Sequence, residues 1–344
     1  MRLSNVLLFA SVANTAASFP PRDTKGFKYD RVLFDLEGYA KENALGPTTG
    51  GEDGEILFVS TSNDLLDAVQ GNEPAAIYVQ GVVELSSRAK LGSNKSLVGV
   101  GEDAGITKNG LTVQDQDNVV IRNLKISNIV GQDGISVNNS TRVWIDHNEF
   151  ESELSLEVGP DTYDGQIDIA HASDWITVSW NYFHDHWKSS LVGNSDANRD
   201  EDSGRLHVTY HHNHWQRAGT RGPAGRFGHQ HVYNNVYEDF LYQAIHSRSD
   251  NQVLVEGNVF KGNTSEALST YGLVIPNDSP NTCTCGDEEL DGFANLGADN
   301  DWGGASINLT QVGDFETAGY EYELTPLESV EAIVLDGAGV GKIN

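Results

Sequence analysis

Hydrophobic and polar residues alternate along most of this chain in short runs, many of which end in Asn followed closely by an aromatic residue. The run Val143-Trp-Ile-Asp-His-Asn-Glu-Phe recurs as Ile176-Thr-Val-Ser-Trp-Asn-Tyr-Phe. Later copies are centred on Asn213, Asn235 and Asn258, and an earlier copy has Leu124 at the Asn position. Short β-branched and aromatic runs broken by Gly, Asn and Asp predict β-strands.

The copies are spaced like the coils of a solenoid. Positions 124, 148, 181, 213, 235 and 258 are 24, 33, 32, 22 and 23 residues apart. A period in the low twenties is typical of a parallel β-solenoid with one coil per repeat, and Asn side chains at equivalent bends can hydrogen-bond along the stack. We predict an all-β parallel β-helix whose two longer coils carry loop excursions on one face. The alternative is a β-sandwich, which strands at a spacing of about 8–12 residues would favour.

A helix is predicted only at residues 63–69, where a polar cap precedes apolar residues at helical spacing. Residues 1–18 have the pattern of a secretory signal, with Arg2, a short apolar core and small residues at 16–18. We therefore expect a secreted protein with a single domain at residues 19–344. Cys283 and Cys285 allow a local disulfide or two free thiols. Sequons at Asn94, Asn139, Asn263 and Asn308 permit N-glycosylation.

The net charge of the chain limits the classes of molecule that it can bind. There are 22 Lys and Arg against 50 Asp and Glu, a net charge of −28. Such a surface repels nucleic acid and anionic membranes, so we expect neither as a partner. In this acidic setting, Arg221 and Arg226 flank Gly-Pro-Ala-Gly. A pair of guanidinium groups can bind carboxylates or phosphates through parallel hydrogen bonds. The alternative is two unrelated surface arginines on a turn.

Carboxylates precede this arginine pair at coil spacing. Asp164 and Asp168 lie in the first long coil, and Asp133 lies one coil earlier. Three carboxylates from adjacent coils would form an oxygen site for a hard cation such as Ca²⁺. The alternative for Asp164 and Asp168 is a polar turn, since Asp-Gly is a common turn pair. Lys188 lies between the aspartates and the arginine pair.

Together these motifs resemble those of the secreted microbial pectate lyases of polysaccharide lyase family one. The matching segments are Val143–His147, Asp164–Asp168, Lys188–Asp196, His211–Asn213 and Arg221–Gly228. The resemblance implies a right-handed parallel β-helix that acts as a monomer on the polygalacturonate of plant cell walls. It implies cleavage of α-1,4 linkages by Ca²⁺-dependent β-elimination, which gives 4,5-unsaturated products.

The resemblance also assigns roles to single residues. Asp133, Asp164 and Asp168 would be the Ca²⁺ ligands, and Lys188 and Arg226 would bind substrate carboxylates. Arg221 would be the base that removes the proton α to a uronate carboxylate. Because arginine is ordinarily protonated near neutral pH, this role needs a depressed pKa, and we expect nearby Ca²⁺, Lys188 and Arg226 to favour the neutral form.

Other functions remain to be weighed against this one. A pectin lyase acting on esterified chains would not need the aspartates, a hydrolase would need an acid/base carboxylate pair, and a non-catalytic solenoid would only bind polysaccharide. All 11 histidines lie between positions 147 and 246, and we expect them to be structural. We expect Arg248 to be a loop or surface residue, and Trp187 to stack on a sugar ring or to pack internally.

Overall fold

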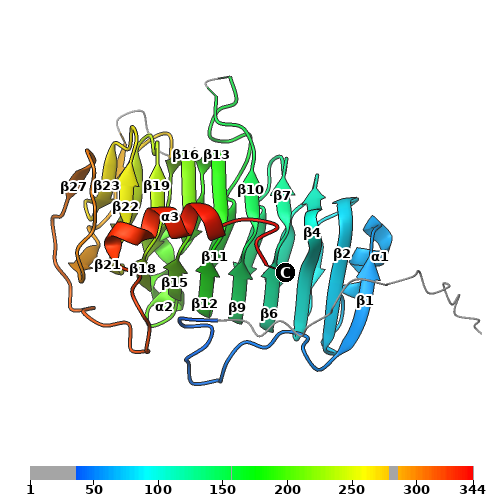
Figure 1. Ribbon diagram of the computed structural model, residues 1–344. Coiled ribbons are helices and arrows are strands. Elements are labelled where there is room, and N and C mark those ends of the chain that lie inside the picture. The colour runs from blue at the N-terminus through cyan, green and yellow to red at the C-terminus, as the bar shows by residue number, and fades with distance from the viewer. Residues whose placement is uncertain (1–35, 156, 279–285, 344) are drawn as a thin grey trace, which may run out of the picture. The chain divides into compact units, whose positions relative to one another are not determined.

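The protein is a parallel β-helix, as predicted. A computed structural model describes residues 36–155, 157–278 and 286–343; the proposed signal segment and both cysteines lie outside these ranges. Strands from successive coils lie side by side and pair in parallel along the length of the solenoid (Figure 1). The structure thus confirms the fold class that the sequence pattern predicted, and it excludes the β-sandwich.

Within the described residues, the strands form two large sheets. The nine-stranded sheet contains β3 (Ala89–Leu91), β5 (Leu111–Gln114), β8 (Ile135–Asn138), β11 (Ile167–Ala170), β14 (Ser190–Val192), β17 (Ala224–Arg226), β20 (Gln243–Arg248), β23 (Glu266–Ser269) and β27 (Ser306–Asn308). The sixteen-stranded sheet has two flanks, which are joined where the long strand β4 pairs with both β6 and β7.

The first flank contains β1 (Glu55–Val59), β2 (Ala75–Glu84), β4 (Lys95–Thr107), β6 (Asp117–Arg122), β9 (Thr141–Asp146), β12 (Asp174–Ser179), β15 (His207–His211), β18 (His229–Tyr233), β21 (Gln252–Glu256) and β26 (Phe293–Leu296). The second contains β7 (Lys125–Ser127), β10 (Glu149–Glu151), β13 (Tyr182–Lys188), β16 (His214–Thr220), β19 (Val236–Glu238) and β22 (Val259–Lys261). Two short strands, β24 (Leu273–Val274) and β25 (Asp287–Glu288), pair antiparallel outside the coils.

An asparagine ladder marks the bend between the two flanks. Asn148 donates from Nδ2 to Oδ1 of Asn181 at 3.0 Å, and Asn181 donates to Asn213 at 3.1 Å. The same bond links Asn213 to Asn235, then to Asn258, and finally to Asn300. At the other end, the main-chain N–H of Leu124 donates to Asn148 Oδ1. The ladder was therefore predicted correctly, and Asn300 extends it by one coil.

The aromatic residue two positions after each ladder Asn packs in the core, and all of these rings are buried except that of Trp302, which is partly buried. Phe150 stacks on Phe183, and Phe183 stacks on Trp215, with ring centroids 5.0 and 4.9 Å apart. The stack continues through Tyr237 and Phe260 to Trp302. Each coil buries one large ring against its neighbours, and so the repeat of the sequence is also the repeat of the core.

Breaking the ladder in its middle should cost substantial stability. Asn213 accepts hydrogen bonds from the main chain and side chain of Asn181, both buried. Asn213→Leu leaves those donors without an acceptor, and each unsatisfied buried group costs about 1–3 kcal/mol. Urea unfolding measures the loss. Asn63→Ala, an exposed change in a helix, should stay within about 0.5 kcal/mol, and equal effects of the two changes would contradict a structural ladder.

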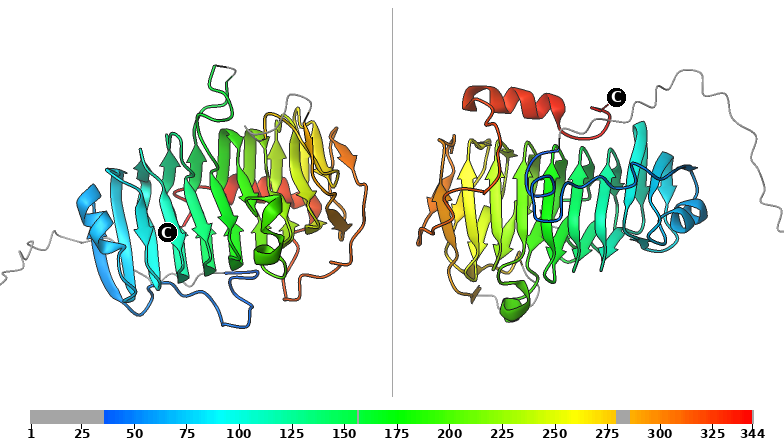
Figure 2. Two further views of the ribbon diagram at one scale, coloured as in Figure 1. Left: turned by 180° about the vertical axis from the view of Figure 1, so that it is seen from behind. Right: turned by 90° about the horizontal axis from the view of Figure 1, so that it is seen from below.

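The helices lie outside the coils. Helix α1 (Ser62–Ala68) confirms the predicted helix: Thr61 caps it by accepting from the Asp64 N–H at 3.2 Å, and Leu65 is buried in the core. It lies beside β1 at one end of the solenoid (Figure 1). Helix α3 (Leu327–Gly337) runs across the second flank (Figure 2), where Val330 and Val334 pack on Val236 and Val259. Helix α2 (Arg199–Asp202) follows the 3₁₀ turn Asp196–Asn198.

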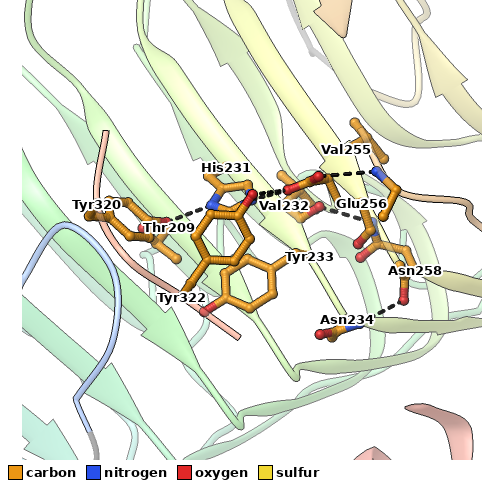
Figure 3. A network of polar contacts seen from close by, with 12 residues as sticks. Thr209, His231, Val232, Tyr233, Asn234, Val255, Glu256, Asn258, Tyr320 and Tyr322 are labelled. Atoms are coloured by element: carbon orange, nitrogen blue, oxygen red, sulfur yellow. Dashed lines mark hydrogen bonds and ion pairs between the residues drawn. The ribbon is translucent and has the colours of Figure 1, made fainter. Parts of the chain in front are cut away.

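The segment before α3 is fastened to the first flank by a buried polar network (Figure 3). His231 lies between Tyr320 and Glu256, with its Nδ1 2.6 Å from the Tyr320 hydroxyl and its Nε2 2.9 Å from Glu256 Oε2. Tyr322 donates to the same carboxylate oxygen at 2.5 Å. These contacts cover the outer face of β15, β18 and β21 in the first flank, whereas the candidate site lies where the second flank leads into the nine-stranded sheet.

Two loop excursions account for the long coils. Residues 152–166 connect β10 to β11, and residues 193–206 connect β14 to β15. The first excursion therefore enters the nine-stranded sheet and the second leaves it, so that both border this sheet. Trp187 is buried and donates from Nε1 to the Val158 carbonyl at 2.6 Å. It packs beneath the first excursion, so the structure supports internal packing of this residue rather than stacking on a sugar ring.

Candidate active site

The three predicted aspartates come together where strands enter the nine-stranded sheet. Asp133 ends the loop before β8, Asp164 ends the first excursion, and Asp168 lies in β11 beside Ser136 of β8. One carboxylate oxygen of each residue lies within 4.8 Å of the others. The Gly165 N–H donates to Asp133 Oδ1 at 3.1 Å, which fixes the excursion against the preceding coil. The parallel register thus brings the aspartates of adjacent coils into one cluster.

The three carboxylates of this cluster repel one another, and the cations nearby offset this repulsion only in part. Burial, and then the neighbouring carboxylates, raise the pKa of Asp133 and raise that of Asp168 well above its usual range. A set of oxygen ligands whose charges repel one another fits a hard cation such as Ca²⁺. The chemistry of the donors therefore agrees with the predicted metal.

A second acidic group provides a contrast. Glu149, Glu151 and His184 also have the spacing of metal ligands, but Lys125 lies 2.9 Å from Glu149 and 2.7 Å from Glu151. Its hydrogen bond with His184 and the nearby Lys125 outweigh burial and lower the pKa of Glu149 to about 2. Ion pairs thus dominate at these carboxylates and lower the pKa of Glu149, whereas burial and mutual repulsion dominate in the aspartate cluster and raise the pKa values of Asp133 and Asp168.

Arg88 supports the aspartate cluster from the preceding coils and was missed by the sequence analysis. Its Nη1 donates to the Asp133 carbonyl at 2.9 Å, and its Nη2 donates to Ser136 Oγ at 2.6 Å. Ser136 in turn donates to the Asp133 carboxylate. Arg88 lies just before β3, two strands from β8 in the nine-stranded sheet, so that coil spacing could have placed it here.

Lys188 ends β13 and reaches the outer side of the aspartates. Its side chain is almost buried, and Nζ lies 3.5 Å from both Asp161 Oδ1 and Asp164 Oδ1. At this distance the contacts are weak ion pairs, and Nζ can gain a closer carboxylate partner. The structure therefore brings Lys188 and the aspartate cluster together, as the coil spacing indicated.

Arg221 follows β16 and is held by a residue that the sequence analysis did not identify. Its Nε donates to Asp278 Oδ1 at 2.7 Å, and its Nη2 donates to the Asp278 main-chain carbonyl. Burial alone would lower the pKa of Arg221, but Asp278, Asp168 and Asp164 outweigh it and raise this pKa. The expectation that Ca²⁺, Lys188 and Arg226 together favour the neutral form concerns the site with Ca²⁺ bound. For the protein alone, the three carboxylates dominate and favour the guanidinium ion.

Arg226 ends β17 and is also engaged. Its Nε and Nη2 donate to the two oxygens of Glu289 at 2.9 and 2.6 Å, and its Nη1 donates to the Gly193 carbonyl at 2.8 Å. A guanidinium has five N–H groups, and the contacts with described residues use three of them, which leaves two that can bind a ligand. Each arginine of the pair is thus held in position by its own carboxylate partner, and the alternative of two unrelated surface arginines is wrong.

Arg248 corrects a further expectation. It lies in β20 beside Arg226 and is completely buried, so it is neither a loop nor a surface residue. Its Nη1 donates to Asp278 Oδ2 at 2.8 Å, and its Nε lies 3.4 Å from Glu289 Oε2. Three arginines therefore share two carboxylates, and the group is one positive charge in excess.

The histidines pack mainly against rings and neighbouring strands. His207 stacks on Trp175 and His229, and His212 stacks on Trp180 at a centroid distance of 4.3 Å. Among the described residues, His184 is the histidine that belongs to a group with metal-ligand spacing. These contacts agree with a structural role.

Buried histidines predict that the protein loses stability in acid. Burial lowers the pKa to about 4 in His186, His212, His214 and His246. In the unfolded chain they titrate near 6.5, so the unfolded state takes up protons first and stability falls as the pH drops from about 6.5 to about 4. Urea unfolding at several pH values tests this, and His171→Asn at an exposed site should leave the trend unchanged. A midpoint that is flat over this range would contradict it.

Fold and site together define a parallel β-helix protein that carries an acidic cation site and clustered cationic side chains where the second flank leads into the nine-stranded sheet. Over residues 33–343 the sequence matches the family described as pectate lyase, and the chain belongs to this family. Pectate lyase A of Aspergillus niger is 39% identical over 305 residues, covering 88% of this chain and 86% of that protein. Pectate lyase A of Emericella nidulans is also 39% identical, covering 88% and 85%.

Solved structures agree with the fold. A pectate lyase from Bacillus sp. N165 in complex with trigalacturonate has a TM-score of 0.74 and 29% identity, covering 90% of this chain and all of that chain. The thermostable pectate lyase PL 47 has a TM-score of 0.72 and 23% identity, covering 92% and 100%. In the described part of the chain, no helix is both long and apolar enough to cross a membrane.

Proposed function

We propose that this protein is a secreted pectate lyase that cleaves polygalacturonate by Ca²⁺-dependent β-elimination. The observation that carries the proposal is the convergence of Asp133, Asp164 and Asp168 with Lys188 and Arg221 on adjacent coils. Membership of the pectate lyase family and the trigalacturonate bound by the Bacillus relative support the substrate. The proposed monomeric state and the signal at residues 1–18 follow from the family resemblance and the sequence.

Asp133, Asp164 and Asp168 would hold the Ca²⁺. When bound, the ion would neutralise the aspartates and withdraw electrons from a uronate carboxylate, which acidifies the neighbouring C–H. The protein and its substrate are both anionic, so cationic side chains must offset their repulsion. Lys188 can offer Nζ to a substrate carboxylate, and Arg226 can offer its two remaining N–H groups.

Arg221 is the proposed base. It removes the proton from C5, the electrons of that bond form the C4=C5 double bond, and the C4–O bond to the leaving sugar breaks. The metal-free charges oppose this role by stabilising the guanidinium ion. A divalent cation at the aspartates would cancel the contributions of Asp168 and Asp164, so we expect the neutral form of Arg221 to become accessible when that site is filled.

Ultraviolet absorbance of the conjugated product provides the test. With polygalacturonate and Ca²⁺, absorbance should rise steadily, and chelation with EGTA should stop the rise. Binding without any rise in absorbance would contradict the enzyme. Activity that resists EGTA and is higher on esterified pectin would indicate a pectin lyase, and new reducing ends without absorbance would indicate a hydrolase.

A further inference from the structure

Asp278 is the most constrained carboxylate near the proposed base. It lies in a turn after β24, where its N–H donates to the Ile275 carbonyl at 2.9 Å. Oδ1 accepts from Arg221 Nε and from the Thr220 hydroxyl at 2.9 Å, and Oδ2 accepts from Arg248. The side chain is 1% exposed. A buried carboxylate with all of these donors is held in one orientation.

The contacts between Asp278 and Arg221 use two different nitrogens of the guanidinium. The carboxylate accepts from Nε, and the main-chain carbonyl of the same residue accepts from Nη2. Among the described residues, no hydrogen bond engages Nη1. Nε and Nη2 are thus both bound to a single residue, and Nη1 is the nitrogen that can bind a ligand.

Arg248 offsets the negative charge of Asp278. Asp278 would otherwise place a full negative charge beside Arg221 in a buried setting. Because the carboxylate is shared between Arg221 and Arg248, its charge is divided between two cations. The complete burial of Arg248 therefore fits an anchor for Asp278 better than contact with substrate.

We propose that Asp278 is a positioning residue that directs Nη1 of Arg221 to the substrate and selects it as the basic nitrogen. This inference rests on the proposed base role of Arg221. A neutral guanidine has one imino nitrogen. Losing the proton from Nε would remove the donor to the buried Oδ1 of Asp278, and losing one from Nη2 would leave a weaker imino N–H as the donor to its carbonyl. Losing it from Nη1 changes neither bond. The logic is that of the aspartate that fixes the tautomer of a catalytic histidine.

The step follows from this choice of nitrogen. The lone pair of Nη1 takes the C5 proton, the C–H electron pair becomes the C4=C5 bond, and the leaving oxygen departs from C4 and is protonated by water. Arg221, now a cation, returns its proton to solvent. Nε and Nη2 keep their bonds to Asp278 throughout, so that the base does not have to reorient during turnover.

Asp278→Asn tests the proposal in the full-length protein with polygalacturonate and Ca²⁺. Orientation becomes less well defined, so kcat should fall about 10- to 100-fold, with KM changing much less. Removing the carboxylate also removes a charge that favours cationic Arg221, so the rising limb of the pH–rate profile should move to lower pH. A simple loss of structure would not move that limb.

Glu289→Gln is the matched control, since it removes one negative charge from the bidentate partner of Arg226. It should change KM more than kcat and leave the pH limb in place. If circular dichroism shows that Asp278→Asn is unfolded, Thr220→Val decides. It removes the hydroxyl that donates to Asp278 Oδ1 and that also lies 3.4 Å from the Trp187 carbonyl. With one donor fewer, the carboxylate stabilises cationic Arg221 more strongly, so the same limb should move to higher pH by a smaller amount.

The outcomes separate the two proposals. A folded Asp278→Asn protein with an unmoved limb, or with kcat and KM changed as in Glu289→Gln, would overturn the positioning role while the lyase function stands. An unmoved limb in Thr220→Val would do the same if Asp278→Asn does not fold. Absence of elimination by the unmutated protein would overturn both.

Discussion

Arg221→Lys should lower kcat by about 10²- to 10⁴-fold, the usual contribution of a positioned base, and should leave binding of trigalacturonate nearly unchanged. Lysine keeps the positive charge, but its ammonium cannot donate from two separate nitrogens to Asp278 and present a third. Turnover is measured by product absorbance and binding by calorimetry in the presence of Ca²⁺.

The control for this change is Arg217→Lys. Arg217 lies in β16, four residues earlier, but its half-exposed side chain pairs with Asp185 away from the aspartate cluster. Its replacement should leave kcat within about twofold, since exposed ion pairs contribute little. Substantial turnover by Arg221→Lys would remove Arg221 from the base role, and a parallel loss of trigalacturonate binding would make it a binding residue.

Asp168→Asn should have opposite effects on function and on stability. It removes one ligand of the proposed Ca²⁺ site, so Ca²⁺ affinity should fall at least about 10²-fold, with elimination at low Ca²⁺ lost accordingly. It also relieves the repulsion that raises the pKa of Asp168 and Asp133. In EGTA, the variant should therefore be more stable than the unmutated protein.

The sign of the pH dependence follows from the raised pKa. A carboxyl group whose pKa is higher in the folded state destabilises that state once the pH exceeds it, so the gain in Asp168→Asn should be present at neutral pH and vanish in acid below the usual aspartate range. Denaturation in EGTA at several pH values measures this. Asp115→Asn, an exposed change on a turn, is the control. A less stable variant in EGTA would mean that Asp168 is held by structural bonds rather than strained by repulsion.

Ca²⁺ itself should stabilise the unmutated protein, since a ligand that binds only the folded state raises its stability by mass action. Thermal unfolding with Ca²⁺ and with EGTA measures the difference, which Asp168→Asn should largely remove. An equal shift in both proteins would place the ion elsewhere.

The sequence predicted those parts of the molecule that repeat. From Asn148 to Asn258, each ladder Asn and the core ring that follows it occupy equivalent positions in their coils, and so spacing alone aligned them. The same spacing brought Asp133, Asp164 and Asp168 together. Because the strands pair in parallel, residues separated by whole coils in the sequence lie at successive positions along the solenoid axis. A regular period therefore allows these positions to be predicted from the sequence.

Contacts made by non-repeating segments could not be predicted in this way. Asp278 and Glu289 lie beyond the last repeat recognised in the sequence, and no periodicity indicates that they return to Arg221 and Arg226. The raised pKa of Arg221 in the protein alone could not be predicted for the same reason, because its strongest carboxylate neighbour belongs to such a segment. Arg248 has a coil position, but its burial depends on that same returning segment.

The asparagine ladder also has a direction. Every link from Asn148 to Asn300 donates toward the C-terminal end, so the side-chain amide dipoles all point the same way along the solenoid. Aligned amides polarise one another, and an inner member loses this support on both sides when it is removed. The loss of stability on substitution should therefore depend on the position in the ladder, and should be greatest near Asn213 and least at Asn300. Without this alignment, near-identical coils would be expected to lose the same stability.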